Sequence, residues 1–343
     1  FSFDTKIICF VGLNGVGKTN ILDSIYHLSY TKSYFNPIPS QNIKHGETFF
    51  FISGKYMIHD KEENILVSLK KGDKKIIKRN NKLYKKFSDH IGKIPLVLIS
   101  PDDRNLIIEG SETRRKFIDG IISQTDKEYL NNLIDYNKTL KQRNALLKMF
   151  YDNSDNIRKT IDIYDRQLSS DAQKIYDKRR EFLNEFIPIF KSRYKELSND
   201  KENVEIKHSS DISPDQNLYK LLKNSLEKDL RFQYTTKGIH KDDLNLSLDN
   251  FPIKKYGSQG QQKTFLIAMK LAQFDYLSKL DSKPILLLDD IFDKLDDARV
   301  KQIINLVNQE KFNQIFISDT NKTRSENIIK LSLIHISEPT RPV

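Results

Sequence analysis

A glycine-rich segment near the start of the chain constrains the fold more than any other feature. Residues 12–19 read Gly-Leu-Asn-Gly-Val-Gly-Lys-Thr, between an apolar run, Ile7 to Val11, and a segment of helical character from about Thr19 to Leu28. Such glycines let successive backbone N–H groups turn toward a phosphate, and the following helix adds its positive end. Strand, glycine loop and helix in this order form a Walker A motif and indicate an α/β fold.

Two side chains of this motif have distinct expected roles. Lys18 reaches the β- and γ-phosphates of ATP, and the Thr19 hydroxyl ligates Mg²⁺. A glycine turn that binds no nucleotide is the alternative, but it would need none of these features. We therefore predict ATP and Mg²⁺ as cofactors, bound by Gly12, Leu13, Asn14, Gly15, Val16, Gly17, Lys18, Thr19 and Asn20.

A second motif ends the apolar run from Pro284 to Leu288, which is typical of a central parallel strand. It delivers Asp289 and Asp290 at the carboxyl end of that strand, in the position of a Walker B motif. Asp289 is expected to hold Mg²⁺ through water, with Thr19 as the other metal ligand. Asp290 stands where a carboxylate polarises the attacking water. Two acids that merely cap a turn are the alternative, which the Walker A motif disfavours.

The sequence Ser-Gln-Gly-Gln-Gln at 258–262 precedes a helical segment and lies 31 residues ahead of Asp289. It resembles the signature motif of ABC-type ATPases, in which a helix N-terminus approaches the γ-phosphate held by a second subunit. Alone it would be only a helix cap. Between the two Walker motifs it predicts that Ser258, Gly260 and Gln261 contact nucleotide. The predicted catalytic residues are Lys18, Ser258, Asp289 and Asp290.

The hydrophobic pattern predicts an ABC-type ATPase head interrupted by a helical lobe. Residues 1–110 are strand-rich, with hairpin turns at Gly72-Asp73 and at Asn80-Asn81. Residues 111–231 have helical spacing, and residues 232–331 return to the order helix, strand, helix. The head is thus expected to consist of 1–110 and 232–331, with 111–231 inserted.

Within the inserted lobe we expect a helical hairpin. Its first helix is predicted to begin at a capping box formed by Thr125 and Glu128. Its second helix is predicted to follow a polar break at 152–156 and to end at Pro188. Both ends of the sequence depart from the pattern: we expect a strand to be missing ahead of Phe1, and residues 332–343 to be a non-native tail.

Composition narrows the functional classes. Lys and Arg number 57 against 46 Asp and Glu, and the resulting +11 would attract a polyanion such as nucleic acid. A lysine-rich surface without such a partner is the alternative. No apolar run approaches the length of a membrane span, which disfavours an integral membrane protein. The single cysteine, Cys9, permits no internal disulfide, so we expect a cytoplasmic protein.

The densest basic segment is Lys70 to Lys86, with nine Lys or Arg and one Asp. DNA binding and protection of a sheet edge explain it equally well. Further candidate DNA contacts lie in the helical lobe: Arg114, Arg115, Arg143, Lys178, Arg179 and Arg180. His240 is expected in a turn or interface, because no nucleophile or metal-ligand set accompanies it.

Together these residues resemble the RecF family, bacterial recombination and repair ATPases related to SMC proteins. Beyond the ATP motifs the resemblance includes residues 100–103, 110–119, 140–144 and 238–243, and Leu295-Asp296 with Arg299 in the D-loop region. It implies an ATP-dependent homodimer released by slow hydrolysis, because Asp rather than Glu stands at position 290. It also implies sequence-independent binding to single-stranded gaps and duplex DNA, together with recombination mediator partners.

Two other interpretations differ in class. An ABC transporter subunit is disfavoured by the long insertion and by Ser318 and Thr320, which stand where transporters place a histidine. Either residue is a candidate sensor of the γ-phosphate. A nucleotide-dependent scaffold that does not act on DNA stays open, because Walker residues bind ATP whether or not turnover matters.

Overall fold

The computed structural model describes residues 1–3, 5–149, 155–198, 202–213, 216–279, 283–291, 314–323 and 326. The chain divides into two compact units, one formed by residues 1–103 with the chain from 264 onward, the other by residues 104–263. Segments from both ends of the sequence therefore share one unit. The predicted boundaries at 110/111 and 231/232 stay a prediction, and the predicted tail lies outside the described residues.

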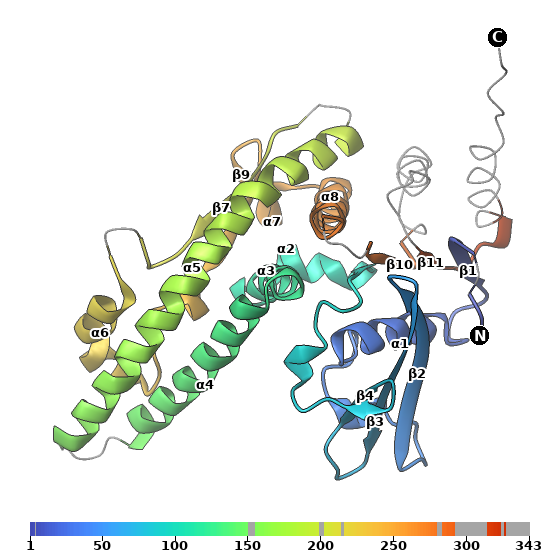
Figure 1. Cartoon of the computed structure of the whole chain (residues 1–343). Helices are drawn as coiled ribbons and strands as arrows, with labels where there is room; N and C mark the ends of the chain where they lie inside the picture. The colour runs from blue at the N-terminus through green and yellow to red at the C-terminus, as the bar shows by residue number, and fades with distance from the viewer. Residues whose placement is uncertain are drawn as a thin grey trace. The chain divides into compact units, whose positions relative to one another are not determined.

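A four-stranded parallel sheet forms the base of the first unit. Its order is β1-β11-β10-β6, of which β1, β11 and β10 are labelled in Figure 1. The strands are β1 (Ile7–Val11), β6 (Leu96–Ile99), β10 (Ile285–Asp289) and β11 (Ile315–Asp319). The last three are buried along their whole length, as their continuous apolar runs predict. Because neighbouring strands are parallel, the loops that follow them meet at one edge.

An antiparallel sheet of order β2-β3-β4-β5 completes the first unit. Its strands are β2 (Phe49–Ile58), β3 (Lys61–Lys70), β4 (Ile76–Arg79) and β5 (Lys82–Leu83). Helix α1 (Lys18–Tyr30) packs against strands of both sheets, and Leu22, Val67 and Leu287 are fully buried in the shared core. The predicted turn at Asn80-Asn81 is confirmed, with φ of 49° and 63°.

Helices and a small sheet build the second unit. Its helices are α2 (Asn105–Ile108), α3 (Ser111–Thr125), α4 (Lys127–Met149), α5 (Asp155–Ser198), α6 (Leu218–Phe232) and α7 (Ile253–Tyr256). The antiparallel strands are β7 (Val204–Ser209), β8 (Asp243–Leu248) and β9 (Phe251–Pro252). Helix α4 packs along α5 (Figure 1). Residues 232–263 fold with this unit because β8 pairs with β7 over six positions, a pairing that the sequence did not predict.

Helix α8 (Gln259–Leu277) spans the boundary between the units at 263/264. Short 3₁₀ segments complete the secondary structure: η1 (Pro39–Asn42), η2 (Phe87–Asp89), η3 (Pro101–Arg104) and η4 (Ile239–Lys241). Among the described helices none combines the length and apolar character needed to cross a bilayer.

The predicted end of the second long helix at Pro188 is wrong. Helix α5 passes through this proline and ends at Ser198 after 44 residues, about 66 Å at 1.5 Å per residue. Phe186, Phe190 and Tyr194 are 1%, 0% and 0% exposed at spacings of four. Burial of this continuous face outweighs the one backbone hydrogen bond that proline removes.

The predicted capping box at Thr125 is also wrong. Thr125 is the last residue of α3, and its hydroxyl donates to the carbonyl of Ile122 at 3.0 Å. The residue that caps α4 is Asp126, whose Oδ1 accepts a hydrogen bond from the Tyr129 backbone N–H at 2.8 Å. Two helices therefore meet at a single aspartate.

Candidate nucleotide-binding site

The glycine loop joins β1 to α1 at the carboxyl edge of the parallel sheet. Gly15 and Gly17 have φ of 83° and 96°, in the left-handed region that glycine adopts without strain. The backbone N–H of Gly12 donates to the Asp319 carbonyl at 3.3 Å, which ties the loop to the end of β11. Leu13 and Val16 are 80% and 64% exposed. The loop therefore opens to solvent directly before a helix N-terminus, where a phosphate group fits.

Lys18 lies across this loop. Its Nζ donates to the carbonyl oxygens of Gly12 at 2.7 Å and Leu13 at 2.9 Å. The ammonium group is thus held beside the N–H groups that would surround a phosphate. From here it can exchange these two carbonyls for phosphate oxygens, which are stronger partners because they carry charge.

Thr19 and Asp289, the predicted metal ligands, lie together although they are 270 residues apart. The Thr19 hydroxyl donates to Asp289 Oδ1 at 3.0 Å. The aspartate is 4% exposed. Hydroxyl and carboxylate oxygens at a phosphate site are the ligands that Mg²⁺ takes from proteins, with the remaining positions filled by phosphate and water. This donor set fits Mg²⁺.

Ser318 connects the two acids, a role that sequence reasoning missed. Its hydroxyl donates to Asp289 Oδ1 at 2.7 Å and accepts from the Asp290 backbone N–H at 3.0 Å. Asp290 has φ of 48°, a left-handed conformation that Asp and Asn tolerate better than other side chains. Ser318 and Thr320 both stay candidate sensors of the γ-phosphate. The signal in the sequence that could have predicted this connecting role was a serine near the end of the strand segment 315–319, which forms β11 and pairs with β10.

Lys270 is a second residue that sequence reasoning missed. It is 6% exposed, and its Nζ contacts Asp103 Oδ1 at 2.6 Å and the Leu98 carbonyl at 3.0 Å. The Tyr34 hydroxyl donates to the same carboxylate at 2.5 Å. Asp103 in turn accepts from the Ser100 backbone N–H at 2.8 Å. This network fixes the loop after β6 at the sheet edge that carries the acids.

The signature segment forms a reciprocal cap at the start of α8. Ser258 Oγ accepts from the Gln261 backbone N–H at 3.2 Å, and Gln261 Oε1 accepts from the Ser258 N–H at 2.7 Å. The Gln261 amide also donates to Glu202 at 2.8 Å. Ser258 is exposed, and Gly260 is half-buried. These residues belong to the second unit, and their contact with nucleotide stays a prediction.

Several arginines of the second unit are structural. Arg179 pairs with Asp119 at 2.9 Å and with Asp242 at 2.8 Å. Arg143 pairs with Asp165 at 2.6 Å and with Asp229 at 2.7 Å. Arg143 and Arg179 are 0% and 1% exposed, so the interpretation of these two as DNA contacts is wrong. Their burial requires the paired carboxylates.

The other four basic candidates for DNA contacts are less buried than Arg143 and Arg179. Arg114 pairs with Asp243 at 2.6 Å, and Arg115 donates to the Asp242 carbonyl at 2.6 Å. Lys178 and Arg180 are exposed. The segments 110–119, 140–144 and 238–243 thus contribute internal contacts to the second unit.

His240 occupies a turn, as expected. Its Nδ1 accepts from the Tyr136 hydroxyl at 2.7 Å, and its Nε2 donates to the Thr235 carbonyl at 3.0 Å. Burial lowers the pKa of His240 to about 4. The imidazole is therefore neutral at physiological pH, and it positions backbone rather than carrying out chemistry.

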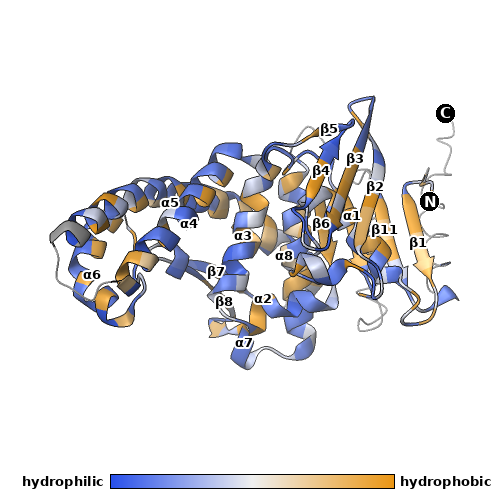
Figure 2. Ribbon diagram, turned by 90° about the horizontal axis from the view of Figure 1, so that it is seen from below, coloured by the Kyte–Doolittle hydropathy of each residue, from blue (hydrophilic) through white to orange (hydrophobic). Residues whose placement is uncertain are grey.

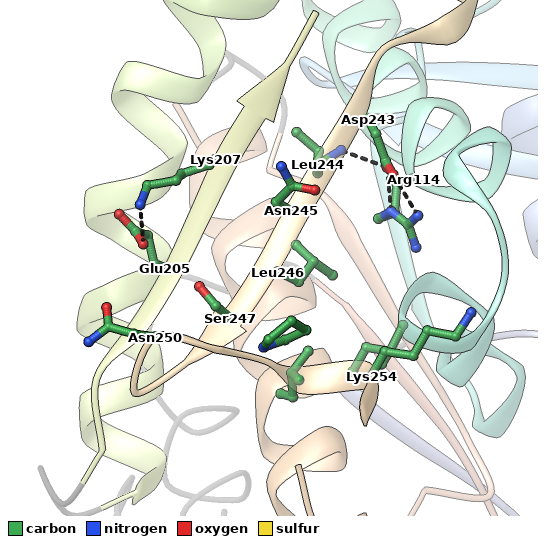
Figure 3. Close-up of a pocket in the computed structure, with 13 residues that line it drawn as sticks. Arg114, Glu205, Lys207, Asp243, Leu244, Asn245, Leu246, Ser247, Asn250 and Lys254 are labelled. Carbon is green, nitrogen blue, oxygen red and sulfur yellow. Dashed lines mark hydrogen bonds and ion pairs between the residues drawn. The ribbon is translucent and has the colours of Figure 1, made fainter. Parts of the chain in front are cut away.

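A pocket of about 390 Å³ lies over β7, β8 and β9 of the second unit (Figure 3). Arg114 and Asp243 form a bidentate pair at one side, with distances of 2.6 and 3.0 Å. Lys207 and Glu205 pair at 2.9 Å at the other. No predicted nucleotide ligand lines it. The predicted D-loop, residues 295–299, lies outside the described residues.

Known proteins resemble the chain over most of its length. A family model described as "AAA domain, putative AbiEii toxin, Type IV TA system" matches residues 7–318. The DNA replication and repair protein RecF of Flavobacterium johnsoniae is 56% identical over 331 residues, which are 96% of this chain and 92% of that protein.

Solved structures agree with these matches. The recombination mediator protein RecF of the RecFOR pathway, solved with ATP, has a TM-score of 0.87 at 31% identity and covers 94% of this chain and 88% of its own. An Smc head bound to the C-winged helix domain of ScpA has a TM-score of 0.51 at 15% identity, covering 94% of this chain and 83% of its own. The latter likeness concerns the fold alone, and the predicted α/β ATPase-head class is confirmed.

Proposed function

Because the chain belongs to the RecF family and to the AAA-domain family of the matching model, we propose that it is an ATP-binding protein of DNA repair and recombination. The observation that carries the proposal is the hydrogen bond between Thr19 and Asp289, which unites the two Walker motifs at the carboxyl edge of the sheet. The solved structure of a RecF protein with ATP supports ATP as the ligand of this site.

We further propose that the site hydrolyses ATP slowly. Thr19 and Asp289 would hold Mg²⁺, which when bound neutralises phosphate charge. Lys18 supplies a counter-charge to the phosphates, and the backbone N–H groups of the glycine loop orient them. Asp290 orients the attacking water and accepts its proton. Its side chain is one methylene shorter than glutamate, which supports a weak ATPase.

The signature segment supports an ATP-dependent homodimer. The cap formed by Ser258 and Gln261 presents the N-terminus of α8, a helix of 19 residues, with Ser258 exposed. Such an end attracts a γ-phosphate held by a second copy. ATP would then join two protomers, and hydrolysis would let them part.

DNA is the proposed cargo. Relatives named as DNA replication and repair proteins and the net charge of +11 support this. We propose sequence-independent binding to single-stranded gaps and duplex DNA, since no base-reading motif was found in the sequence. By its likeness to the RecFOR protein, we also propose recombination mediator proteins as partners.

ATP turnover measured with and without DNA tests these proposals against the alternatives. We expect slow hydrolysis that DNA alters, together with DNA binding strengthened by ATP. ATP binding without turnover or DNA binding would favour a scaffold, and turnover indifferent to DNA would favour another ABC-type ATPase. In light scattering, Ser258→Arg should block the ATP-dependent dimer, whereas Ser53→Arg, at an exposed serine of β2, is the control.

A further inference from the structure

The antiparallel sheet of the first unit has one face that is apolar yet exposed. Residues opposite each other on paired strands share a face, so the register assigns the side chains. Val67 and Ile77 on the inner face are 0% exposed. The opposite face, called here the outer face, carries Phe49, Phe51, Met57, Ile76 and Leu83, which are 41% to 69% exposed. Figure 2 shows the mixed orange and blue strands of this sheet.

Lysines share the outer face with these apolar side chains. Lys70 stands opposite Phe49, and Lys78 stands opposite Leu66. Both lysines are exposed. Lys55 lies on the same face and pairs with Glu62 at 3.1 Å. Aromatic rings and cations therefore lie on the same face of the sheet.

The sheet also concentrates the positive charge of the chain. Residues 49–86 contain eleven Lys or Arg against four Asp or Glu, an excess of seven where the whole chain has +11. Several of these cations do not lie on the outer face: Lys75 donates to the Thr31 carbonyl, Arg79 pairs with Glu63 at 2.5 Å, and the register places Lys61 and Lys82 on the inner face. The basic segment predicted from the sequence is thus partly structural, and its exposed members include Lys70 and Lys78 on the outer face.

We propose that the outer face binds single-stranded DNA, with bases stacked on Phe49 and Phe51 and phosphates held by Lys70 and Lys78. The inference rests on the proposed action on DNA and names a surface for it. Phe49 and Phe51 are 52% and 65% exposed. They are two residues apart on β2, about 6.8 Å at the strand rise, so each ring can take a separate base. Stacking on aromatic rings tolerates any base sequence.

Three alternative roles would each use only part of this surface. Lysines that protect a sheet edge from aggregation account for the charge, but not for two exposed phenylalanines on the edge strand. A protein partner accounts for the rings, but lysine is depleted in protein interfaces. Duplex DNA would contact the lysines only, because its bases are already stacked on one another. A single strand can contact both the aromatic rings and the lysines.

The first test uses the absence of tryptophan from the whole chain. In Phe51→Trp the indole is the sole tryptophan reporter of its surface. We expect an unstructured oligonucleotide of about 20 thymidines to quench its emission, and a duplex of equal length to leave it unchanged. Binding detected by anisotropy of a labelled oligonucleotide without quenching would overturn the proposal. So would an emission change on raising the protein concentration without DNA, which would indicate a second copy on this face.

The second test compares affinities at one salt concentration. The double variant Phe49→Ala/Phe51→Ala should bind the oligonucleotide at least about 25-fold more weakly, since alanine removes a stacking contact at each ring. Its duplex affinity should change less than about 2-fold. Ile38→Ala changes an exposed apolar residue outside the sheet; it is the control and should bind both DNAs normally. Equal losses for single strand and duplex would contradict stacking.

The lysines are tested by salt dependence. Lys70→Gln/Lys78→Gln should flatten the slope of log K against log[salt] for the single strand by about 1.4, or about 0.7 for each phosphate contact. Lys44→Gln, an exposed lysine outside the sheet, should leave the slope unchanged. An unchanged slope in the double variant overturns the assigned phosphate contacts. If the wild type with ATP binds no DNA of either form, the proposed action on DNA fails as well.

Discussion

The two units use polar side chains in opposite ways. In the first, Lys18 and Asp290 lie half-buried at the carboxyl edge of a sheet, and the Lys18 ammonium donates hydrogen bonds to nearby carbonyls. In the second, Arg143 and Arg179 are buried with their carboxylate partners. The first arrangement can exchange partners when a ligand arrives, whereas the second cannot be broken without leaving a buried charge. Residues typical of one family are thus proposed to bind ligand in one unit, and they stabilise the structure in the other.

The largest effect is expected from a variant that breaks the buried ion-pair network of Arg179. Arg179→Ala removes the shared partner of Asp119 and Asp242 and should lower the free energy of unfolding by about 3–5 kcal/mol. Chemical denaturation followed by circular dichroism measures this. Arg180→Ala changes an exposed neighbour and should cost less than about 0.5 kcal/mol. Equal effects of the two variants would contradict the buried role of Arg179.

At the glycine loop we expect a substitution to lower ligand affinity without lowering stability. Lys18→Ala should weaken ATP binding by about 100-fold, which corresponds to about 2.7 kcal/mol, while the melting temperature without ATP stays the same. Calorimetric titration gives the affinity. At one ATP concentration, ATP should raise the melting temperature of the wild type and of Lys44→Ala much more than that of Lys18→Ala. Retained affinity in Lys18→Ala would refute the phosphate-binding role.

A smaller change separates binding from turnover. Asp290→Asn keeps a residue that tolerates the left-handed backbone, so the loop should survive while hydrolysis falls by about 10-fold or more. Phosphate release assays measure the rate, and light scattering should show a longer-lived ATP dimer. Asp102→Asn, an exposed acid before Asp103, is the control. Wild-type hydrolysis in Asp290→Asn would remove the carboxylate from the mechanism.

The smallest effect compares one histidine of lowered pKa in each unit. Burial lowers the pKa of His27 to about 4, with Lys75 adding to the shift, and burial likewise lowers the pKa of His240 to about 4. Both are neutral in the fold, and the unfolded chain binds their protons below about pH 6.5. Stability should therefore fall as pH drops from 6.5 toward 4, by about 1.3 kcal/mol for each histidine at pH 5.5.

Denaturation at pH 7.5 and 5.5 measures this loss. His27→Gln and His240→Gln should each reduce the difference between the two pH values, because glutamine does not titrate. A variant that shows the full wild-type loss would exclude its histidine as a source of acid sensitivity.

Sequence reasoning succeeded where the signal is local. The glycine spacing of residues 12–19 and the apolar run before Asp289 each specify an element within a few positions. It failed where distant residues decide. Arg179 looks like a surface charge until Asp119 and Asp242 are placed beside it.

The same cause underlies the remaining errors. The rule that proline ends a helix is local, whereas the burial of Phe190 and Tyr194 that overrides it depends on the whole unit. The link from Ser318 to Asp289 requires the register between two strands, which neither strand encodes alone. Lys270 and Asp103 meet across 167 residues for the same reason.

The pairing of β1 with β11 also has a consequence during protein synthesis. In the described sheet β1 has β11 as its neighbour, so Ile7 pairs with Ile315 and Val11 with Asp319. The segment that starts the glycine loop therefore emerges from the ribosome long before its sheet partner exists. At about 5–20 residues per second, the delay is about 15–60 s. A nascent chain would acquire its ATP site only after β11 has been translated, so a product truncated before β11 would carry the Walker A sequence without a working site.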